Sequence, residues 1–164
     1  MSFQKQVNAN QALGNVGQIS KAHHSFLNVV PAIAADEFVK VGSFVQSKTS
    51  PTNENEVIGA SGKQITGSIL GVVVRDSLKV AGDSTPTLEV KKGENCAILT
   101  EGSIFIEVNA IAKKGQYVFL KTADGSLGFY NASTQNDYTY TGFRVSKGQD
   151  TATAGIIEIT TARA

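Results

Sequence analysis

The chain has 164 residues, with 15 lysines and arginines against 14 acidic residues, so its formal net charge is only +1. This balance excludes the clustered basic excess that is typical of nucleic-acid-binding proteins. The single cysteine, Cys96, excludes an intrachain disulfide, and no stretch reaches the roughly 20 apolar residues of a membrane-spanning helix. We therefore expect one domain-sized protein whose partner is neither nucleic acid nor a membrane.

The first 20 residues are rich in Gln, Asn and small side chains and show no strong apolar period. We predict that residues 1–20 form an extended N-terminal arm that becomes ordered on a partner surface, although a frayed terminus without a role fits the same composition. The N-terminus also lacks the apolar core of a secretory signal, so we expect no signal peptide.

From residue 26 onward, short β-type runs are separated by glycine turns, and no helical pattern interrupts them. The apolar residues 26–30 end at Pro31, which cannot donate to a sheet and therefore indicates a strand end or an edge. In the next apolar run, residues 38–45, Gly42 indicates a bulge or a close approach of two backbones.

Residues 46–66 are polar almost throughout and predict a long surface loop or a small protruding hairpin. Connections longer than about 12–15 residues are uncommon in compact domains and are often functional. Residues 69–74 are the most hydrophobic segment, and their β-branched side chains predict a central strand buried on both faces.

The rest of the chain continues in the same manner, and Asp124–Gly125 predicts a hairpin turn. Further strand candidates lie at residues 87–90, 96–100, 104–108, 117–120, 138–140, 143–145 and 155–159. We predict an all-β protein, a β-sandwich or barrel-like domain of about ten short strands. The arm of residues 1–20 would precede a single β domain at residues 21–164, with the polar excursion at 46–66.

No group of residues predicts a catalytic, cofactor-binding or metal-binding site. His23 and His24 would point to opposite faces of a strand and lack a third ligand, so they do not form a metal site. Ser25 next to His24 lacks the Gly-x-Ser-x-Gly elbow of a hydrolase. Cys96 lies in an apolar run without a basic neighbour and is predicted to be a buried structural thiol.

The segment 59–64 ends like a phosphate-binding loop, but Val57 and Gln64 stand where that motif needs glycine and Ser or Thr. Three carboxylates near turns do not form an acid–base pair: Asp76, Asp83 and Glu89. We therefore predict a protein that is not an enzyme and needs no cofactor.

Aromatic residues gather in the C-terminal half: Phe105, Tyr117, Phe119, Phe129, Tyr130, Tyr138, Tyr140 and Phe143. We predict core or cross-strand packing for most of them. A platform for single-stranded nucleic acid would need interleaved Lys and Arg on the same strands, and these strands carry few.

The order of the glycine and apolar patterns is similar to that of the capsid cement, or decoration, proteins of tailed bacteriophages. The patterns that carry the resemblance lie at residues 14–19, 38–45, 69–73, 98–106 and 112–118. Gln116 and Ser43 depart from the family, which often has an acidic residue and an arginine at these places.

The resemblance implies a β-rich homo-oligomer, a dimer or trimer, on the outer surface of a virion and made in the host cytoplasm. Such a protein binds the major capsid protein and cements neighbouring subunits against the pressure of packaged DNA. The family has no catalytic residues to carry over. We expect the arm, residues 2–20, and the excursion, residues 46–66, to make much of the bridging contact. The alternatives are another virion module of a tail or fibre, or a small oligomeric β-fold ligand-binding protein or enzyme.

Overall fold

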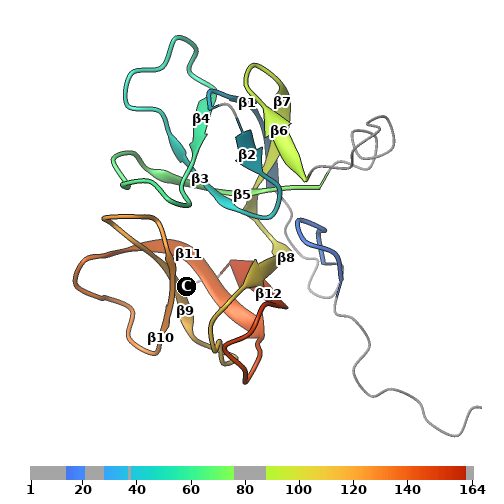
Figure 1. Cartoon of the computed structure of the whole chain (residues 1–164), viewed down its shortest axis with the longest axis vertical. Helices are drawn as coiled ribbons and strands as arrows, with labels where there is room; N and C mark the ends of the chain where they lie inside the picture. Colours follow the sequence, from blue (N-terminus) through green and yellow to red (C-terminus); the bar gives the residue numbers. More distant parts are fainter. Residues whose placement is uncertain (1–13, 21–27, 37, 76–87, 162–164) are drawn as a thin grey trace, which may run out of the picture.

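A computed structural model describes residues 14–20, 28–36, 38–75 and 88–161 of the chain. In these ranges it contains twelve strands and no helix (Figure 1). The prediction of an all-β protein is therefore confirmed. The strands form two units that lie one above the other in Figure 1, with a small two-stranded ribbon beside the upper one.

The first unit is a closed five-stranded barrel. In order around the barrel, its strands are β1 (Asn28–Ala34), β4 (Glu56–Gly59), β3 (Phe44–Ser47), β5 (Ile69–Val73) and β7 (Asn95–Glu101). All neighbouring strands are antiparallel except β1 and β4, which are parallel. The ribbon pairs β2 (Phe38–Lys40) with β6 (Glu89–Lys91).

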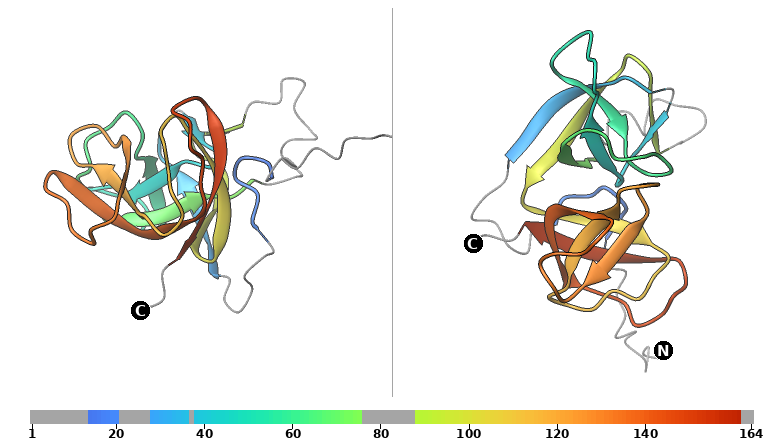
Figure 2. Two further views of the ribbon diagram at one scale, coloured as in Figure 1. Left: turned by 90° about the horizontal axis from the view of Figure 1, so that it is seen from below. Right: turned by 90° about the vertical axis from the view of Figure 1, so that its left-hand side faces the viewer.

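The second unit is an open, antiparallel five-stranded sheet. Its order is β10 (Leu127–Tyr130), β9 (Tyr117–Lys121), β11 (Tyr138–Lys147), β12 (Gly155–Thr161) and β8 (Ser103–Val108). The sheet curls as it runs from β10 to β8, as Figure 2 shows from below. Gly102, with a φ of 131°, is the single residue between β7 and β8, so the chain passes from one unit to the other without a loop.

Alternating side chains divide the apolar residues into two cores. Val45, Val73 and Ile98 point into the barrel. Their chain neighbours Phe44, Val72 and Leu99 point outward and join the core face of the sheet. The Phe44 ring meets the Phe143 ring edge to face, with the two centroids 5.7 Å apart. The larger core therefore holds the barrel and the sheet together.

Two local predictions about glycines are confirmed. A Cβ at Gly42 would collide with the Val16 side chain and would lie 3.0 Å from the backbone nitrogen of Gly17, so two backbones approach closely here. The turn at Asp124 and Gly125 joins the antiparallel strands β9 and β10. Asp124 Oδ1 accepts a hydrogen bond from Ser126 Oγ at 2.6 Å, and Gly125 takes the positive φ of 66° that the turn needs.

Two other local predictions need correction, the first only in part. Of the two alternatives for Pro31, the edge is confirmed and the strand end is wrong, because Pro31 lies inside β1 and pairs with Ala97 of β7. It is tolerated because β1 pairs with β4 only at Ile33 and Ala34, so β1 has a partner on one side alone at the proline. Leu70 in the predicted doubly buried strand is 38% exposed, although Val72 and Val73 next to it are fully buried.

Candidate functional site

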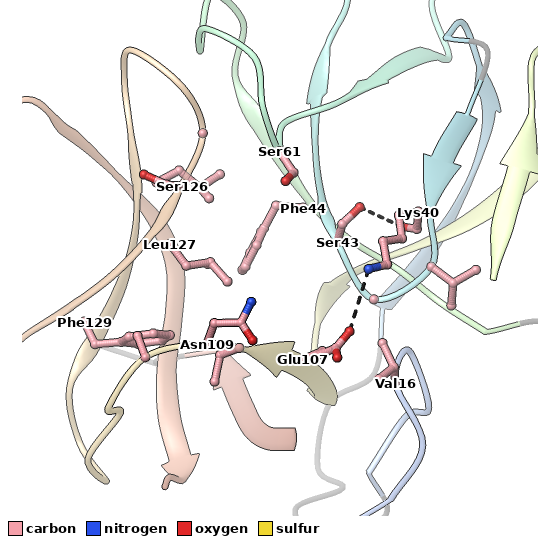
Figure 3. A pocket seen from close by; sticks show the side chains of 16 residues that line it. Val16, Lys40, Ser43, Phe44, Ser61, Glu107, Asn109, Ser126, Leu127 and Phe129 are labelled. Carbon is pink, nitrogen blue, oxygen red and sulfur yellow. Dashed lines mark hydrogen bonds and ion pairs between the residues drawn. The ribbon is translucent and has the colours of Figure 1, made fainter. Parts of the chain in front are cut away.

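An open groove of about 500 Å³ lies between the barrel and the five-stranded sheet (Figure 3). Phe44 of β3 lines it from the barrel, and Leu127 and Phe129 of β10 line it from the sheet. These three side chains point toward one another in Figure 3, and Leu127 and Phe129 also pack against the larger core. The groove is thus a shallow continuation of the apolar contact between the two units.

The rim of the groove is polar but almost uncharged. Lys40 and Glu107 are the only charged residues among those described that line it, and they form an ion pair at 3.7 Å. Their side chains are 61% and 46% exposed, so this pair contributes about 0–1 kcal/mol to the free energy of unfolding. Ser61, Asn109 and Ser126 supply neutral polar groups. The groove therefore suits a neutral occupant better than an anion or a cation.

Residues 14–20, the last part of the predicted arm, pack on this molecule itself. The backbone of Gly17 donates to the Phe105 carbonyl at 2.8 Å and accepts from the Arg75 N–H at 2.8 Å. Ser20 N–H donates to the Ser103 carbonyl, and Ile19 bridges to Ile104 of β8. This segment covers part of the β8 edge of the sheet. The prediction for residues 1–13 lies outside the described residues.

The face of the sheet that points away from the core carries interlocked aromatic rings, which we call the outer aromatic face: Tyr117, Phe119, Tyr130, Tyr138 and Tyr140. Neighbouring ring centroids lie 5.1 to 6.4 Å apart. Four of these five rings are partly or well exposed, and Phe119 lies beneath them. The predicted cross-strand packing of the tyrosines is confirmed.

Polar groups fix two of these rings. Arg144 lies 4.1 Å above the centre of the Tyr117 ring and donates from Nη2 to the Tyr117 hydroxyl at 2.6 Å. A hydrogen bond with Tyr138 raises the pKa of the Tyr130 phenol. The outer aromatic face is therefore a rigid surface of tyrosines with one guanidinium, a composition that is common at protein-binding hot spots.

The predicted excursion at 46–66 includes more regular structure than its composition suggested. Its first residues end β3, and residues 56–59 form β4, which pairs with both β3 and β1. Gln46 is fully buried, and its amide accepts from the Thr66 and Gly67 N–H groups and donates to the Gln64 carbonyl. Two stretches are exposed, the β3–β4 hairpin loop and residues 61–64 after β4. In the hairpin loop, Glu56 accepts hydrogen bonds from Lys48 at 2.7 Å and from the Thr52 N–H at 2.9 Å.

Several residues considered as chemical candidates lie outside the described residues: His23, His24, Ser25, Asp76 and Asp83. Cys96 is buried in β7, as predicted for a structural thiol. Lys63 forms an ion pair with Asp36 at 2.6 Å, and Glu89 is exposed at the start of β6. Among the described residues, no three His, Cys, Asp or Glu side chains come together in a way that could hold a metal ion. No helix in the same ranges is long and apolar enough to cross a membrane.

The sequence interpretation missed the groove, the buried Gln46 and strand β4. Phe44 and Phe129 line the groove from positions far apart in the chain, so no local pattern marks them as neighbours. The signal for β4 was present in Val57 and Ile58, two apolar β-branched residues, but polar residues surround them.

Comparison with known proteins identifies the family. The model of a family described as structural cement protein (E217 gp24/Pam3 gp6) matches residues 3–162 of this chain. The chain belongs to this family of phage cement proteins. It is a structural virion protein that decorates a capsid and cements it, and the resemblance found in the sequence is confirmed.

Two solved structures are similar to this cement protein in fold. The first, described as the capsid of Myoviridae phage XM1, aligns with a TM-score of 0.59 and 17% identity over 98% of this chain and 97% of that chain. The second, the head fiber gp8.5 N base of bacteriophage phi29, has a TM-score of 0.44 and 11% identity over 85% of this chain and 100% of that chain, which is too low to support an inference. No curated protein matched the chain.

Proposed function

We propose that this cement protein binds the outer surface of the phage capsid as a homo-oligomer and ties neighbouring major capsid subunits together against the pressure of packaged DNA. The observation that carries the proposal is the family match over residues 3–162. The match includes both the β-fold and most of the N-terminal arm, so the exposed faces of the fold and the arm are the candidates for attachment. Many modest contacts of this kind add up to stable binding on a repeating lattice.

The protein acts by contact, without catalysis, and its partners are proteins rather than nucleic acid or a membrane. The structural role of the family supports this view. The formal net charge of +1 supports recognition through shape and apolar contact, because an electrostatic partner would favour a strongly charged surface. The protein is made in the host cytoplasm together with the capsid subunits that it binds.

The outer aromatic face is our candidate for the contact with the major capsid protein. Tyr140 is 36% exposed at its surface, and Arg144 stacks on Tyr117 beside it. Tyrosine and arginine contribute much of the binding energy where they become buried in an interface. The β3–β4 hairpin loop adds polar residues at the opposite end of the molecule (Figure 1).

The first test is to purify particles and measure the copy number of this protein relative to the major capsid protein by mass spectrometry. We expect a simple ratio that corresponds to hundreds of copies on each particle. Only a few copies would place the protein at a tail or a single vertex, and its absence from particles would contradict the proposal.

The contact face is tested with two aromatic substitutions. Tyr140→Ser should lower the occupancy of the protein on particles, whereas Phe38→Ser should leave it unchanged. Phe38 is the matched control because it is an aromatic residue that is 59% exposed on the β2–β6 ribbon, far from the outer aromatic face in sequence and sheet. Equal occupancy of both variants would exclude the outer aromatic face as the contact.

The arm is tested by deletion. Removal of residues 2–12 should weaken attachment to the capsid while circular dichroism shows an unchanged fold, because the variant keeps the contacts that Gly14 and Gly17–Ser20 make with the body of the molecule. Unchanged occupancy of the deletion variant would show that the arm has no role in attachment.

A further inference from the structure

Strand β10 has an open flank. It pairs with β9 on one side, and within the described ranges no strand pairs with its other side. The Lys121 N–H donates to the Ser126 carbonyl at 2.8 Å, so the backbone groups of Ser126 and of every second residue after it point toward β9. In an antiparallel ladder the direction of the backbone groups alternates, so the N–H and C=O groups of Leu127 and Phe129 point away from β9. These groups are free to pair with an added strand.

The groove lies next to this flank. The side chains of Leu127 and Phe129 line it, and Phe44 faces them from the barrel (Figure 3). A strand added along β10 would therefore place every second side chain in the groove and the side chains between them outside. Such an occupant needs an apolar face, a polar face and little charge, because Lys40 and Glu107 at the rim already compensate each other.

Residues 1–13 have this composition. The odd-numbered positions carry Met, Phe, Lys, Val, Ala, Gln and Leu, and the even-numbered positions carry Ser, Gln, Gln, Asn, Asn and Ala. Apolar residues thus occupy five of the seven odd positions, and polar residues occupy five of the six even positions. The first 20 residues taken together show no strong apolar period, but within residues 1–13 the alternation matches that of a strand buried on one face. Lys5 is the only charged side chain in the segment.

The place where this segment joins the body favours a groove on another molecule. Gly14 lies against the Phe105 ring, 2.4 Å from Cδ2 when measured from the position of a Cβ. Phe105 points away from the core, because its neighbours Ile104 and Ile106 are core residues. Gly14 therefore lies on the outer face of the sheet, whereas Leu127 and Phe129 line the groove from the core-facing side. Val16 lines the groove only near Glu107, away from Leu127 and Phe129 (Figure 3).

The segment is also long enough to reach a neighbour. Thirteen extended residues span about 43 Å, and pairing with the four residues of β10 uses only about 13 Å of this length. The remaining residues can cross between two molecules that lie side by side.

We propose that residues 1–13 of one copy bind as an added strand along β10 of a second copy, with the odd-numbered side chains in its groove. The inference rests on the proposed homo-oligomer and deepens it by assigning the contact. Each molecule donates one arm and accepts another, so the copies become linked to one another in addition to their attachment to the capsid.

The test uses purified full-length protein without capsids. This protein carries a photo-reactive benzoylphenylalanine in place of Val7. Protein of natural isotope content and ¹⁵N-labelled protein are unfolded and refolded together, irradiated and digested, and the adducts are identified by mass spectrometry. We expect adducts between the arm and residues 120–130 that join one labelled and one unlabelled chain. Adducts only within one chain would mean that each molecule fills its own groove, and adducts elsewhere, or none, would also overturn the proposal.

A pair of adjacent substitutions provides the matched control. Val7→Asp places a carboxylate in the apolar groove, and Asn8→Asp places the same charge on the polar face. We expect Val7→Asp to weaken association at least about tenfold by analytical ultracentrifugation and Asn8→Asp to change it little. Equal effects would contradict an alternating strand.

Amide exchange gives a readout at single residues. The amides of Leu127 and Phe129 should be protected in the wild-type protein and lose their protection in Val7→Asp. Those of Gly128 and Tyr130 pair with β9 and should stay protected in both. Capsids are absent from these experiments, so an arm that fails to bind leaves the cement function standing. If the arm is exchanged between copies but the protein is absent from purified particles, the cement function is refuted and the arm exchange stands.

Discussion

The barrel and the five-stranded sheet solve the same problem of exposed strand edges in different ways. The barrel closes on itself, and its interior is filled with small aliphatic residues such as Ala34, Val45 and Ile98. The sheet stays open, carries aromatic rings on its outer face and ends at the unpaired flank of β10. A closed barrel offers few backbone groups to a partner, whereas an open sheet offers an edge. The barrel thus acts as the scaffold and the sheet as the surface for interaction.

The contrast between scaffold and interaction surface assumes that the barrel and the sheet unfold as one unit. The largest expected effect tests this assumption. Phe143 belongs to the sheet, is 1% exposed and packs on Phe44 of the barrel. Phe143→Ala should lower the free energy of unfolding by about 3–5 kcal/mol, because it leaves a cavity between the units. Urea denaturation should show a single transition at lower urea for both circular dichroism and tyrosine fluorescence. Phe38→Ala, at an exposed position, should change stability by no more than about 0.5 kcal/mol. Two separate transitions would show that the core between the units does not couple them.

The second effect concerns a buried polar side chain of the barrel. Gln46 is fully buried and holds the loop that follows β4 through hydrogen bonds with Gln64, Thr66 and Gly67. Gln46→Ala should lower the free energy of unfolding by about 2–3 kcal/mol, because it removes three part-buried hydrogen bonds that each contribute about 1 kcal/mol. The Thr66 and Gly67 amides should then exchange faster with solvent. Gln64→Ala is the control, because only the backbone carbonyl of Gln64 takes part. If the control loses as much stability, the buried amide is not what fixes the loop.

The third effect measures how tightly the two units fit. Gly125 and Gly115 both have a positive φ, 66° and 90°. A Cβ at Gly125 would lie 1.8 Å from the Ala60 carbonyl oxygen of the barrel, whereas a Cβ at Gly115 has nothing within 4 Å. Gly115→Ala should cost about 1 kcal/mol from backbone strain alone. Gly125→Ala should cost at least about 2 kcal/mol, because the hairpin must also move away from the barrel. If the two variants lose the same stability in thermal unfolding, the hairpin can move away from the barrel at little energetic cost.

The sequence predicted individual strands well because alternation and glycine turns are local signals. The hairpin at Asp124 and Gly125 and the close approach at Gly42 followed from single residue types with a clear conformational preference. The closed barrel, the open sheet and the groove could not be predicted in this way. They depend on contacts such as that of Phe44 with Phe143, which bring together residues from distant parts of the chain.

The sequence predicted no chemical site and could not locate the surfaces that bind a partner. The tyrosines were predicted to pack across strands, and they do, but alternation alone could not show that Tyr117 and Tyr140 lie on the face away from the core. That face became evident only when Val118 and Leu120, which alternate with Tyr117 in β9, were found in the core. The single-domain organisation, the oligomer and the role of residues 1–13 stay predictions.

The smallest expected effect concerns the ion pair of Lys48 and Glu56 in the β3–β4 hairpin loop of the barrel. The hydrogen bond from Lys48, followed by that from the Thr52 N–H, lowers the pKa of the Glu56 carboxyl below its ordinary value of 4.5. A lowered pKa in the folded protein means that ionised Glu56 adds stability above its unfolded pKa, and that this stability is lost as the pH falls through the folded pKa. Lys48→Met should therefore move the Glu56 pKa upward toward the ordinary value in an NMR titration. High salt should reduce the difference between the variant and the wild type, because the Lys48 side chain is 35% exposed and solvent ions screen its charge. A Glu56 pKa that does not move in Lys48→Met would show that the ion pair does not order this loop, and the barrel would then present a freely moving polar loop at the end opposite the aromatic face.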